Sequence, residues 1–248
     1  MKYDFLVLSL LFCVPGLVVF AVRRDLRRPI GLAAAASLPF AATERFFYPT
    51  YWSPRFAFDL IDVVGFGIED VLFVVALAAY MTTAYPFVAR RRFVAPELPA
   101  GDARRRGPGP RLARRALAVV GATLAAALGL LAAGVPILYA SFYSMAAAAI
   151  VMLVVRRDLL VPALAGGALS TVTYAVICLI YARIFPGVFE RVWHTERFLH
   201  RFVLGVPIEE LLYGLLSGVV SGAFYPFVTG ARLAPLSPDR GGAGAAPP

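Results

Sequence analysis

The residues Gly205-Val206-Pro207-Ile208-Glu209-Glu210 open an apolar stretch that continues to Val228, and the same arrangement occurs twice in the chain. The earlier copy, Gly65-Phe66-Gly67-Ile68-Glu69-Asp70, stands 140 residues before it. Both apolar stretches end in the same four residues, Tyr-Pro-Phe-Val, at positions 85–88 and 225–228. Self-similarity on this scale indicates that one structural unit has been duplicated.

A second repeated segment extends the duplication toward the start of the chain. Val22-Arg23-Arg24-Asp25-Leu26 recurs as Val155-Arg156-Arg157-Asp158-Leu159. The repeats predict two equivalent units, residues 1–95 and 135–230, joined by residues 96–134, which hold a basic loop and one linker helix. Residues 231–248 are rich in Pro, Gly and Ala, a composition typical of a disordered tail.

The composition indicates an integral membrane protein. Of the 248 residues, 60% are hydrophobic and only 16% are charged, whereas about a quarter of the residues in soluble domains are charged. The apolar residues fall in runs of about 18 or more, long enough to cross a bilayer as helices. We expect an all-α, polytopic membrane protein with about seven transmembrane helices, at residues 3–22, 30–48, 60–89, 116–133, 135–155, 159–182 and 203–229.

Each predicted unit has three helices, and this odd number determines the relative orientation of the two units in the membrane. One additional helix between them returns the second unit to the orientation of the first, so we expect two parallel three-helix repeats with the functional site between them. Of the 24 basic residues, 17 fall beside loops on one side, which the positive-inside rule places in the cytoplasm. This predicts a multi-pass protein of the inner cell membrane, with its N-terminus outside and its C-terminus in the cytoplasm.

The pairs Glu69-Asp70 and Glu209-Glu210 are the most informative polar residues, because an ionisable group within a span costs about 2.5–3.5 kcal/mol. Glu209 is expected about six residues inside its helix, and neighbouring helical residues point about 100° apart. Glu210 shares its face with a strip of three glycines, which predicts a helix contact, whereas Glu209 and Glu69 are expected to face a common cavity. Carboxyl groups close together in a dry pocket would share a proton and could act as a general acid. Alternatively, these acids cap a helix or pair with buried arginine.

The surroundings of the acids resemble those of a known family. Pro207-Ile208-Glu209-Glu210-Leu211-Leu212-Tyr213, with its counterpart at residues 67–73, resembles the Pro-(Leu/Ile)-Glu-Glu-x-x-aromatic signature of the heterodimeric-type lycopene cyclase domain. Such domains occur in bacterial carotenoid cyclases and are fused in tandem in archaeal and fungal ones. The resemblance implies acid-catalysed, redox-neutral conversion of the linear ends of lycopene to β-ionone rings within the membrane. Gly67 and Asp70 depart from the signature.

The resemblance implies that the motif acids are catalytic: Glu69, Asp70, Glu209 and Glu210. Aromatic faces that could stabilise a cation and bind the substrate come from nearby positions: Trp52, Phe66, Phe73 and Tyr213. We expect no cofactor or metal, since the chain lacks a dinucleotide-binding glycine motif and its few histidines and cysteines are not spaced as ligands. The expected partners are a lipophilic polyene, membrane lipids, and further copies of the chain or other carotenoid enzymes. Nucleic acid is not expected, because no basic stripe interleaved with aromatic residues is present.

Two other functions fit the same pattern. SWEET-like transporters share this topology, although a chain without Asn or Gln lacks the amide groups that normally bind sugars, so the substrate would be small or apolar. A non-catalytic membrane subunit that binds carotenoid or lipid is also compatible. Glu44, next to Arg45, is expected to form a local ion pair at the membrane interface.

Overall fold

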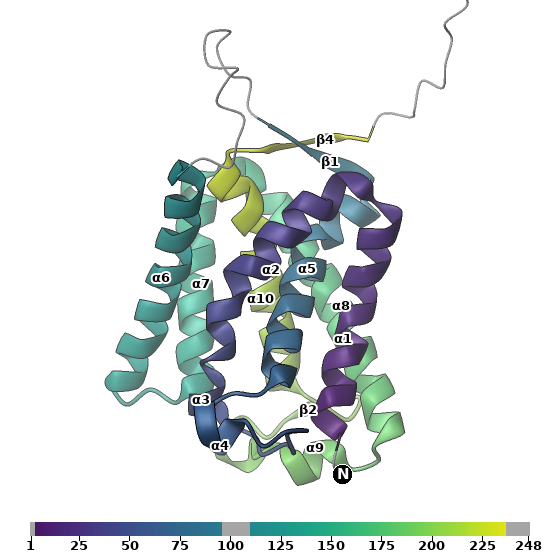
Figure 1. The fold of residues 1–248 in the computed structure, drawn as a ribbon, viewed down its shortest axis with the longest axis vertical. Helices are drawn as coiled ribbons and strands as arrows, with labels where there is room; N and C mark the ends of the chain where they lie inside the picture. The colour runs from purple at the N-terminus through teal and green to yellow at the C-terminus, as the bar shows by residue number, and fades with distance from the viewer. Residues whose placement is uncertain (1–2, 96–109, 237–248) are drawn as a thin grey trace, which may run out of the picture.

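The computed structural model describes residues 3–95 and 110–236, which form a bundle of long helices with short segments at both ends (Figure 1). The first half holds α1 (Asp4–Val22), η1 (Arg24–Leu26), α2 (Arg27–Ala41), α3 (Glu44–Phe47), α4 (Ile61–Val64) and α5 (Ile68–Val88). The second half holds α6 (Pro110–Ala132), α7 (Ile137–Val155), η3 (Arg157–Leu159), α8 (Leu160–Ile184), α9 (Val188–Val192), η4 (Thr195–Arg197) and α10 (Ile208–Thr229). The described part of the chain is thus all-helical apart from two short strand pairs, as predicted.

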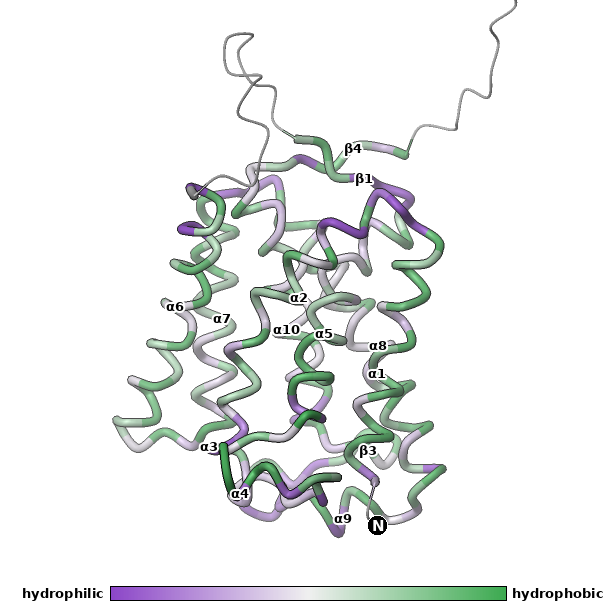
Figure 2. The backbone as a smooth tube through the Cα atoms, viewed as in Figure 1, coloured by the Kyte–Doolittle hydropathy of each residue, from purple (hydrophilic) through white to green (hydrophobic). Residues whose placement is uncertain are grey.

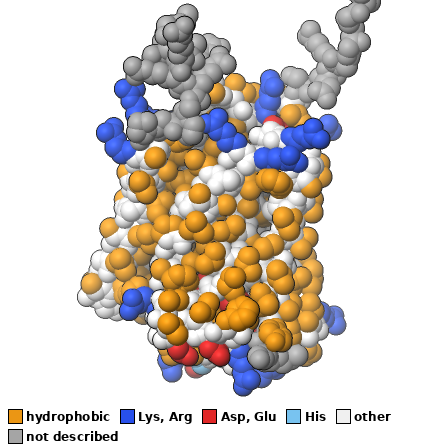
Figure 3. All heavy atoms as spheres, in the orientation of Figure 1, with side chains coloured by type: hydrophobic (Ala, Val, Ile, Leu, Met, Phe, Trp, Pro, Cys, Tyr) orange, Lys and Arg blue, Asp and Glu red, His pale blue; other side chains and the backbone are white. Residues whose placement is uncertain are grey.

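Within the described residues, six helices are long and apolar enough to cross a membrane: α1, α5, α6, α7, α8 and α10. The helix at the second predicted span, α2, has only 15 residues. Hydrophobic residues dominate the middle of the bundle and hydrophilic residues gather toward its two ends (Figure 2). The surface shows the same banding, with basic side chains, all of them arginine in the described part of the chain, at both ends (Figure 3). This distribution is compatible with a membrane protein.

Three of the long helices are shorter than the apolar runs that predicted them. The second ends at Ala41, because the hydroxyl of Thr43 donates to the carbonyl of Phe40 at 2.6 Å and turns the chain. The third begins at Ile68, because Gly65 interrupts the run in the left-handed conformation, with φ of 85°.

The last helix also begins later than predicted. Residues 202–207 form a hairpin of β2 (Phe202–Val203) and β3 (Val206–Pro207), and α10 starts at Ile208. Both acidic pairs therefore lie in the first turn of a helix, and the prediction that Glu209 stands six residues inside its helix is wrong. In the first turn, unpaired backbone N–H groups and the helix dipole favour negative charge.

A two-stranded antiparallel sheet joins the ends of the two halves. β1 (Arg91–Val94) follows α5 and pairs with β4 (Arg232–Pro235), which follows α10. The predicted disordered tail is therefore ordered at its start, because its backbone groups find partners in β1. The rest of the tail, 237–248, and the middle of the basic loop, 96–109, lie outside the described residues. The linker helix begins at Pro110, earlier than predicted.

The Arg-Arg-Asp turn that follows α1 connects this helix to the end of α5 through the side chain of Arg23. Arg23 forms an ion pair with Asp25 at 2.8 Å and donates to the carbonyls of Pro86 and Arg91 at 3.4 and 2.6 Å. Hydrogen bonds from Arg23 hold the pKa of Asp25 below its ordinary value. The turn after α1 is thereby tied to the end of α5.

The second half contains the same set of contacts. Arg156 pairs with Asp158 at 2.6 Å and donates to the carbonyls of Pro226 and Ala231 at 3.2 and 3.0 Å. Pro226 is the residue that corresponds to Pro86 in the repeat. The turn after α7 is thus tied to the end of α10 in the way that the turn after α1 is tied to α5.

The glycine strip of α10 packs against α8. A Cβ atom at Gly218 would lie 2.6 Å from Cβ of Ser170, and one at Gly214 would lie 3.1 Å from Cβ of Tyr174. Such close approach is possible only without side chains at these positions of α10. It brings Tyr174 of α8 next to Glu210 of α10.

Candidate active site

Both acidic motifs contribute to one partly open cavity of about 70 Å³ between the two halves, here called the acid cavity. Three carboxyl groups line it: Glu44 of α3, Asp70 of α5 and Glu210 of α10. The remaining wall is mainly aromatic and aliphatic and includes side chains from α1, α2, α7 and α8. An apolar cavity with a few converging polar groups is the usual form of a small-molecule site.

Glu210 accepts hydrogen bonds from three donors. Its Oε1 accepts from the hydroxyl of Tyr51 at 2.6 Å and from Nε1 of Trp193 at 2.8 Å, and its Oε2 accepts from the hydroxyl of Tyr174 at 2.5 Å. Because all three partners donate, Glu210 has the role of an ionised carboxylate in these bonds. Oε2 has one partner only, so it retains a lone pair that can accept a proton.

Glu44 and Asp70 form a pair of interacting carboxyl groups on the side of the first half. Oε1 of Glu44 accepts from Nε1 of Trp52 at 2.7 Å, and Oδ2 of Asp70 accepts from the backbone N–H of Gly67 at 2.6 Å. Both side chains are buried and line the same cavity. Two negative charges close together in an apolar cavity are unfavourable, so the pair is suited to hold one proton between them.

The position of Glu44 corrects the prediction made for it. Its side chain is 8% exposed and faces the acid cavity, whereas the guanidinium of Arg45 lies 5.5 Å from the ring centroid of Phe46. The predicted ion pair between Glu44 and Arg45 is therefore absent. A carboxyl group placed among tryptophan and carboxyl partners is better suited to proton transfer than to anchoring at an interface.

The first acid of each motif has a different place from the one predicted. Oε1 of Glu69 accepts from the backbone N–H of Ala57 at 2.7 Å, and Oε1 of Glu209 accepts from the N–H of Leu199 at 2.8 Å. Both side chains are almost completely buried, and neither lines the acid cavity. The prediction that Glu69 and Glu209 face a common cavity is wrong, because each lies at a helix start and points back to the preceding loop. These two acids hold the loops in place.

Three of the four predicted aromatic residues line the acid cavity. Phe73 and Tyr213, which correspond in the repeat, stack across the two halves with ring centroids 6.4 Å apart and planes at 24°. Trp52 also lines the cavity and forms an isolated β-bridge with Trp193. Phe66 is half-buried and lines no described cavity, so it is not part of this site.

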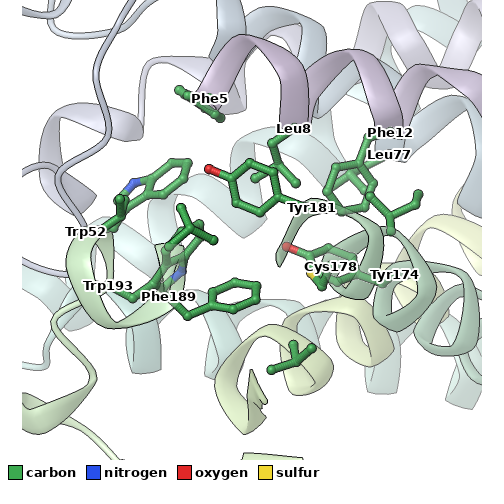
Figure 4. Close-up of a cluster of buried hydrophobic side chains, with 14 of the residues drawn as sticks. Phe5, Leu8, Phe12, Trp52, Leu77, Tyr174, Cys178, Tyr181, Phe189 and Trp193 are labelled. Carbon is green, nitrogen blue, oxygen red and sulfur yellow. The ribbon is translucent and has the colours of Figure 1, made fainter. Parts of the chain in front are cut away.

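A cluster of aromatic side chains lies beside the acid cavity (Figure 4). The ring of Trp52 lies 4.5 Å from that of Phe5 and 5.0 Å from that of Trp193, measured between centroids. Phe189 and Tyr181 extend the cluster behind Trp193. On this side, the acid cavity is therefore backed by packed rings and not by polar groups.

Four residues of the site were not predicted as functional from the sequence: Glu44, Tyr51, Tyr174 and Trp193. Trp193 stands 141 residues after Trp52, close to the repeat offset, so the duplication itself was a signal for it. Tyr174 is a polar side chain within an apolar run, which is a second such signal. Within residues 3–95 and 110–236, no group of three His, Cys, Asp or Glu side chains is arranged to hold a metal ion.

Comparison with known proteins finds a family similarity in the second half of the chain. The family model of lycopene cyclase matches residues 136–228. The match runs from the start of α7 to the end of α10, so the segment that is similar to lycopene cyclase contributes Tyr174, Trp193 and Glu210 to the acid cavity. The resemblance expected from residues 207–213 is thereby confirmed. No curated protein and no solved structure matches the chain.

Proposed function

We propose that the protein is an intramembrane carotenoid cyclase, an isomerase that forms ionone rings at the ends of a linear polyene such as lycopene. The observation that carries the proposal is the meeting of both acidic motifs at one acid cavity, where Glu44, Asp70 and Glu210 face the same apolar space. The lycopene cyclase match of the second half supports the same chemistry.

Ring formation begins when the proton held between Glu44 and Asp70 passes to the terminal double bond of the polyene, which forms a C–H bond and leaves a carbocation. A nearby double bond attacks the cation and closes the ring, so that the positive charge moves to a ring carbon. Oε2 of Glu210 then removes a proton from the neighbouring carbon, and a double bond is restored. The substrate gains and loses one proton and exchanges no electrons. The proton returns from Glu210 to the pair after the product has left.

The surroundings of the three acids suit a cationic intermediate. The stacked rings of Phe73 and Tyr213 offer π faces to positive charge, and the carboxylate of Glu210 adds a negative charge in an apolar cavity. Apolar walls keep water from capturing the cation before the ring closes. Tyr51 and Tyr174 fix the orientation of Glu210 through their hydroxyl groups.

The same proposal includes the membrane arrangement. The chain crosses the membrane seven times, with α2 as a short second span, as two parallel units at residues 1–95 and 135–230. The matching contacts of Arg23 and Arg156 support the duplication, and the pairing of β1 with β4 requires α5 and α10 to end at the same side. The arginine-rich end, with the C-terminus, faces the cytoplasm, and the N-terminus lies outside.

The test of the proposed function is expression of the full chain in cells that accumulate lycopene, followed by chromatography of the pigments. The wild-type protein should convert lycopene to ring-containing carotenoids, and Glu210→Gln should reduce conversion by about 10²-fold or more. Glu190→Gln, at an exposed position on α9, is the matched control and should behave like wild type.

Unchanged lycopene in cells with abundant, membrane-inserted protein would refute the cyclase. The two remaining functions would then be separated by their own assays. Uptake into vesicles would identify a transporter, and pigment retained by the purified protein would identify a non-catalytic carotenoid-binding subunit.

A further inference from the structure

A second, larger cavity of about 160 Å³ adjoins the acid cavity. The two cavities share five lining residues: Phe40, Thr43, Phe47, Val74 and Tyr213. The larger one, here called the chain groove, lies between α2, α5, α6, α7 and α10. The shared wall makes the two cavities direct neighbours, and these five side chains are where a linear molecule would pass from one cavity to the other.

The walls of the chain groove suit a hydrocarbon. Among residues 3–95 and 110–236, no charged side chain lines it. Its polar members are hydroxyl groups, and those of Ser37, Thr123 and Ser217 each donate to a carbonyl of their own helix. Mainly apolar walls favour contact with hydrocarbon over contact with water. Sugars, nucleotides and lipid headgroups would find no charged partner and few free donors.

The chain groove is elongated along the bundle. On α10 its lining runs from Tyr213 to Phe224, which corresponds to about 16 Å along the helix axis. Tyr213 is at the end shared with the acid cavity, so the two sites lie end to end. A linear molecule with its terminus beside Glu210 therefore extends along α10, and its middle part lies against Ser217 and Val220.

We propose that the chain groove binds the linear hydrocarbon part of the polyene while one end reacts in the acid cavity, and that α6 forms its outer wall. This inference rests on the proposed function. Six residues of α6 line the chain groove: Val119, Val120, Thr123, Leu124, Ala127 and Leu128. α6 lies outside both repeated units and outside the lycopene cyclase match. In this proposal the linker helix α6 binds the substrate and recognises its length.

The test fills the chain groove without touching the acids. Ala36 of α2 and Ala127 of α6 line the chain groove, whereas their neighbours Ala35 and Ala126 are exposed and do not line it. Ala36→Phe and Ala127→Phe should reduce lycopene conversion by about tenfold or more, because the chain is displaced from its productive position. Ala35→Phe and Ala126→Phe are the matched controls and should convert lycopene like wild type.

A short acyclic polyene with the same terminal group as lycopene separates binding of the chain from damage to the acids. Ala36→Phe and Ala127→Phe should convert this short substrate at the wild-type rate, since it occupies the acid cavity alone. Equal loss of both substrates, or full retention of both, would overturn the inference.

The same experiments distinguish a failure of the chain-groove inference from a failure of the proposed cyclase function. If wild-type protein converts neither substrate, the cyclase fails, and the amount of lycopene that copurifies with each variant becomes the measurement. Lower lycopene retention by Ala36→Phe and Ala127→Phe than by their controls would support the chain groove even then. Equal retention, or none in the wild type, would refute it.

Discussion

At the scale of single residues, the main result is that the two acids of each acidic pair have different roles. In both halves the first acid bonds to a loop backbone, and the second lines the acid cavity. The sequence located both pairs, because acids in apolar runs are costly and their repetition is visible. It did not show which acid faces inward, since that depends on where each helix starts. The start is set by the turn at Gly65 and the hairpin at residues 202–207.

Replacing Glu44 with glutamine should lower ring formation, whereas replacing Glu209 with glutamine should leave it almost unchanged. Glu44→Gln removes a proton donor from the acid cavity and should lower ring formation by about 10²-fold or more. Glu209→Gln keeps an oxygen that can accept from Leu199 and should leave ring formation near the wild-type level. Pigment analysis in lycopene-accumulating cells measures both, with protein amounts in the membrane compared by immunoblot.

A loss in Glu209→Gln as severe as in Glu44→Gln would contradict the assignment of Glu209 to loop positioning. Glu209→Leu, whose side chain cannot accept the hydrogen bond from the backbone N–H of Leu199, tests the structural role of Glu209. It removes the acceptor of the part-buried N–H of Leu199 and should destabilise the protein by about 1 kcal/mol, which thermal inactivation in detergent would detect.

At the scale of elements, apolar runs predicted the long helices well but not their ends. α2 stops at Ala41, and α5 and α10 begin several residues late, because hydrogen bonds and glycine conformations override hydropathy at the helix ends. The sheet of β1 and β4 could not be predicted, since its strands lie far apart in the sequence and are paired by the fold. The Arg-Arg-Asp turns were visible as a repeat, but their carbonyl partners were not.

The Asp25 ion pair predicts a pH-dependent contribution to stability. The pKa of Asp25 is lower in the folded protein than in the unfolded chain, so its contribution is present above about pH 4 and is lost as the pH falls through the folded pKa. Because the side chain of Asp25 is 36% exposed, the contribution should stay below about 1 kcal/mol.

Thermal unfolding in detergent measures this contribution. Asp25→Asn should unfold at a lower temperature than wild type at pH near 7, and the difference should shrink toward pH 3. Asp62→Asn, at an exposed position on α4, is the control and should show no such dependence. A difference between Asp25→Asn and wild type that stays constant over this pH range would rule out the ion pair as its source.

At the scale of the whole molecule, the two halves of the chain build one asymmetric site. The repeat predicted that the acidic motifs would meet between the units. It did not predict that Tyr174 and Glu44 would each come from one unit only. At the offset of 133 residues, Tyr174 corresponds to Ala41, and Glu44 corresponds to Ile177. Site residues of this kind have a different residue type at the corresponding position of the other unit. They are determined by the packing of the fold and leave no repeat in the sequence.

If the proposed cyclase reacts only at the acid cavity, the two ends of a polyene must react in separate binding events. The one-ring product would then leave and return with its other end first. In a time course with limiting enzyme and excess lycopene, the one-ring product should therefore accumulate before the two-ring product. Chromatography of samples taken at intervals measures both. Two-ring product formed from the first time point, with no free one-ring pool, would contradict a single site.

The pairing of β1 with β4 also bears on how the protein is made. Residues 91–94 leave the ribosome long before residues 232–235, and four long helices are synthesised between them. The late strand can reach the early one only if both halves have entered the bilayer in the same direction. In the proposed membrane arrangement, an inverted second half would leave both strands unpaired. The small sheet can therefore form only after α10 has been inserted in the direction that matches α5.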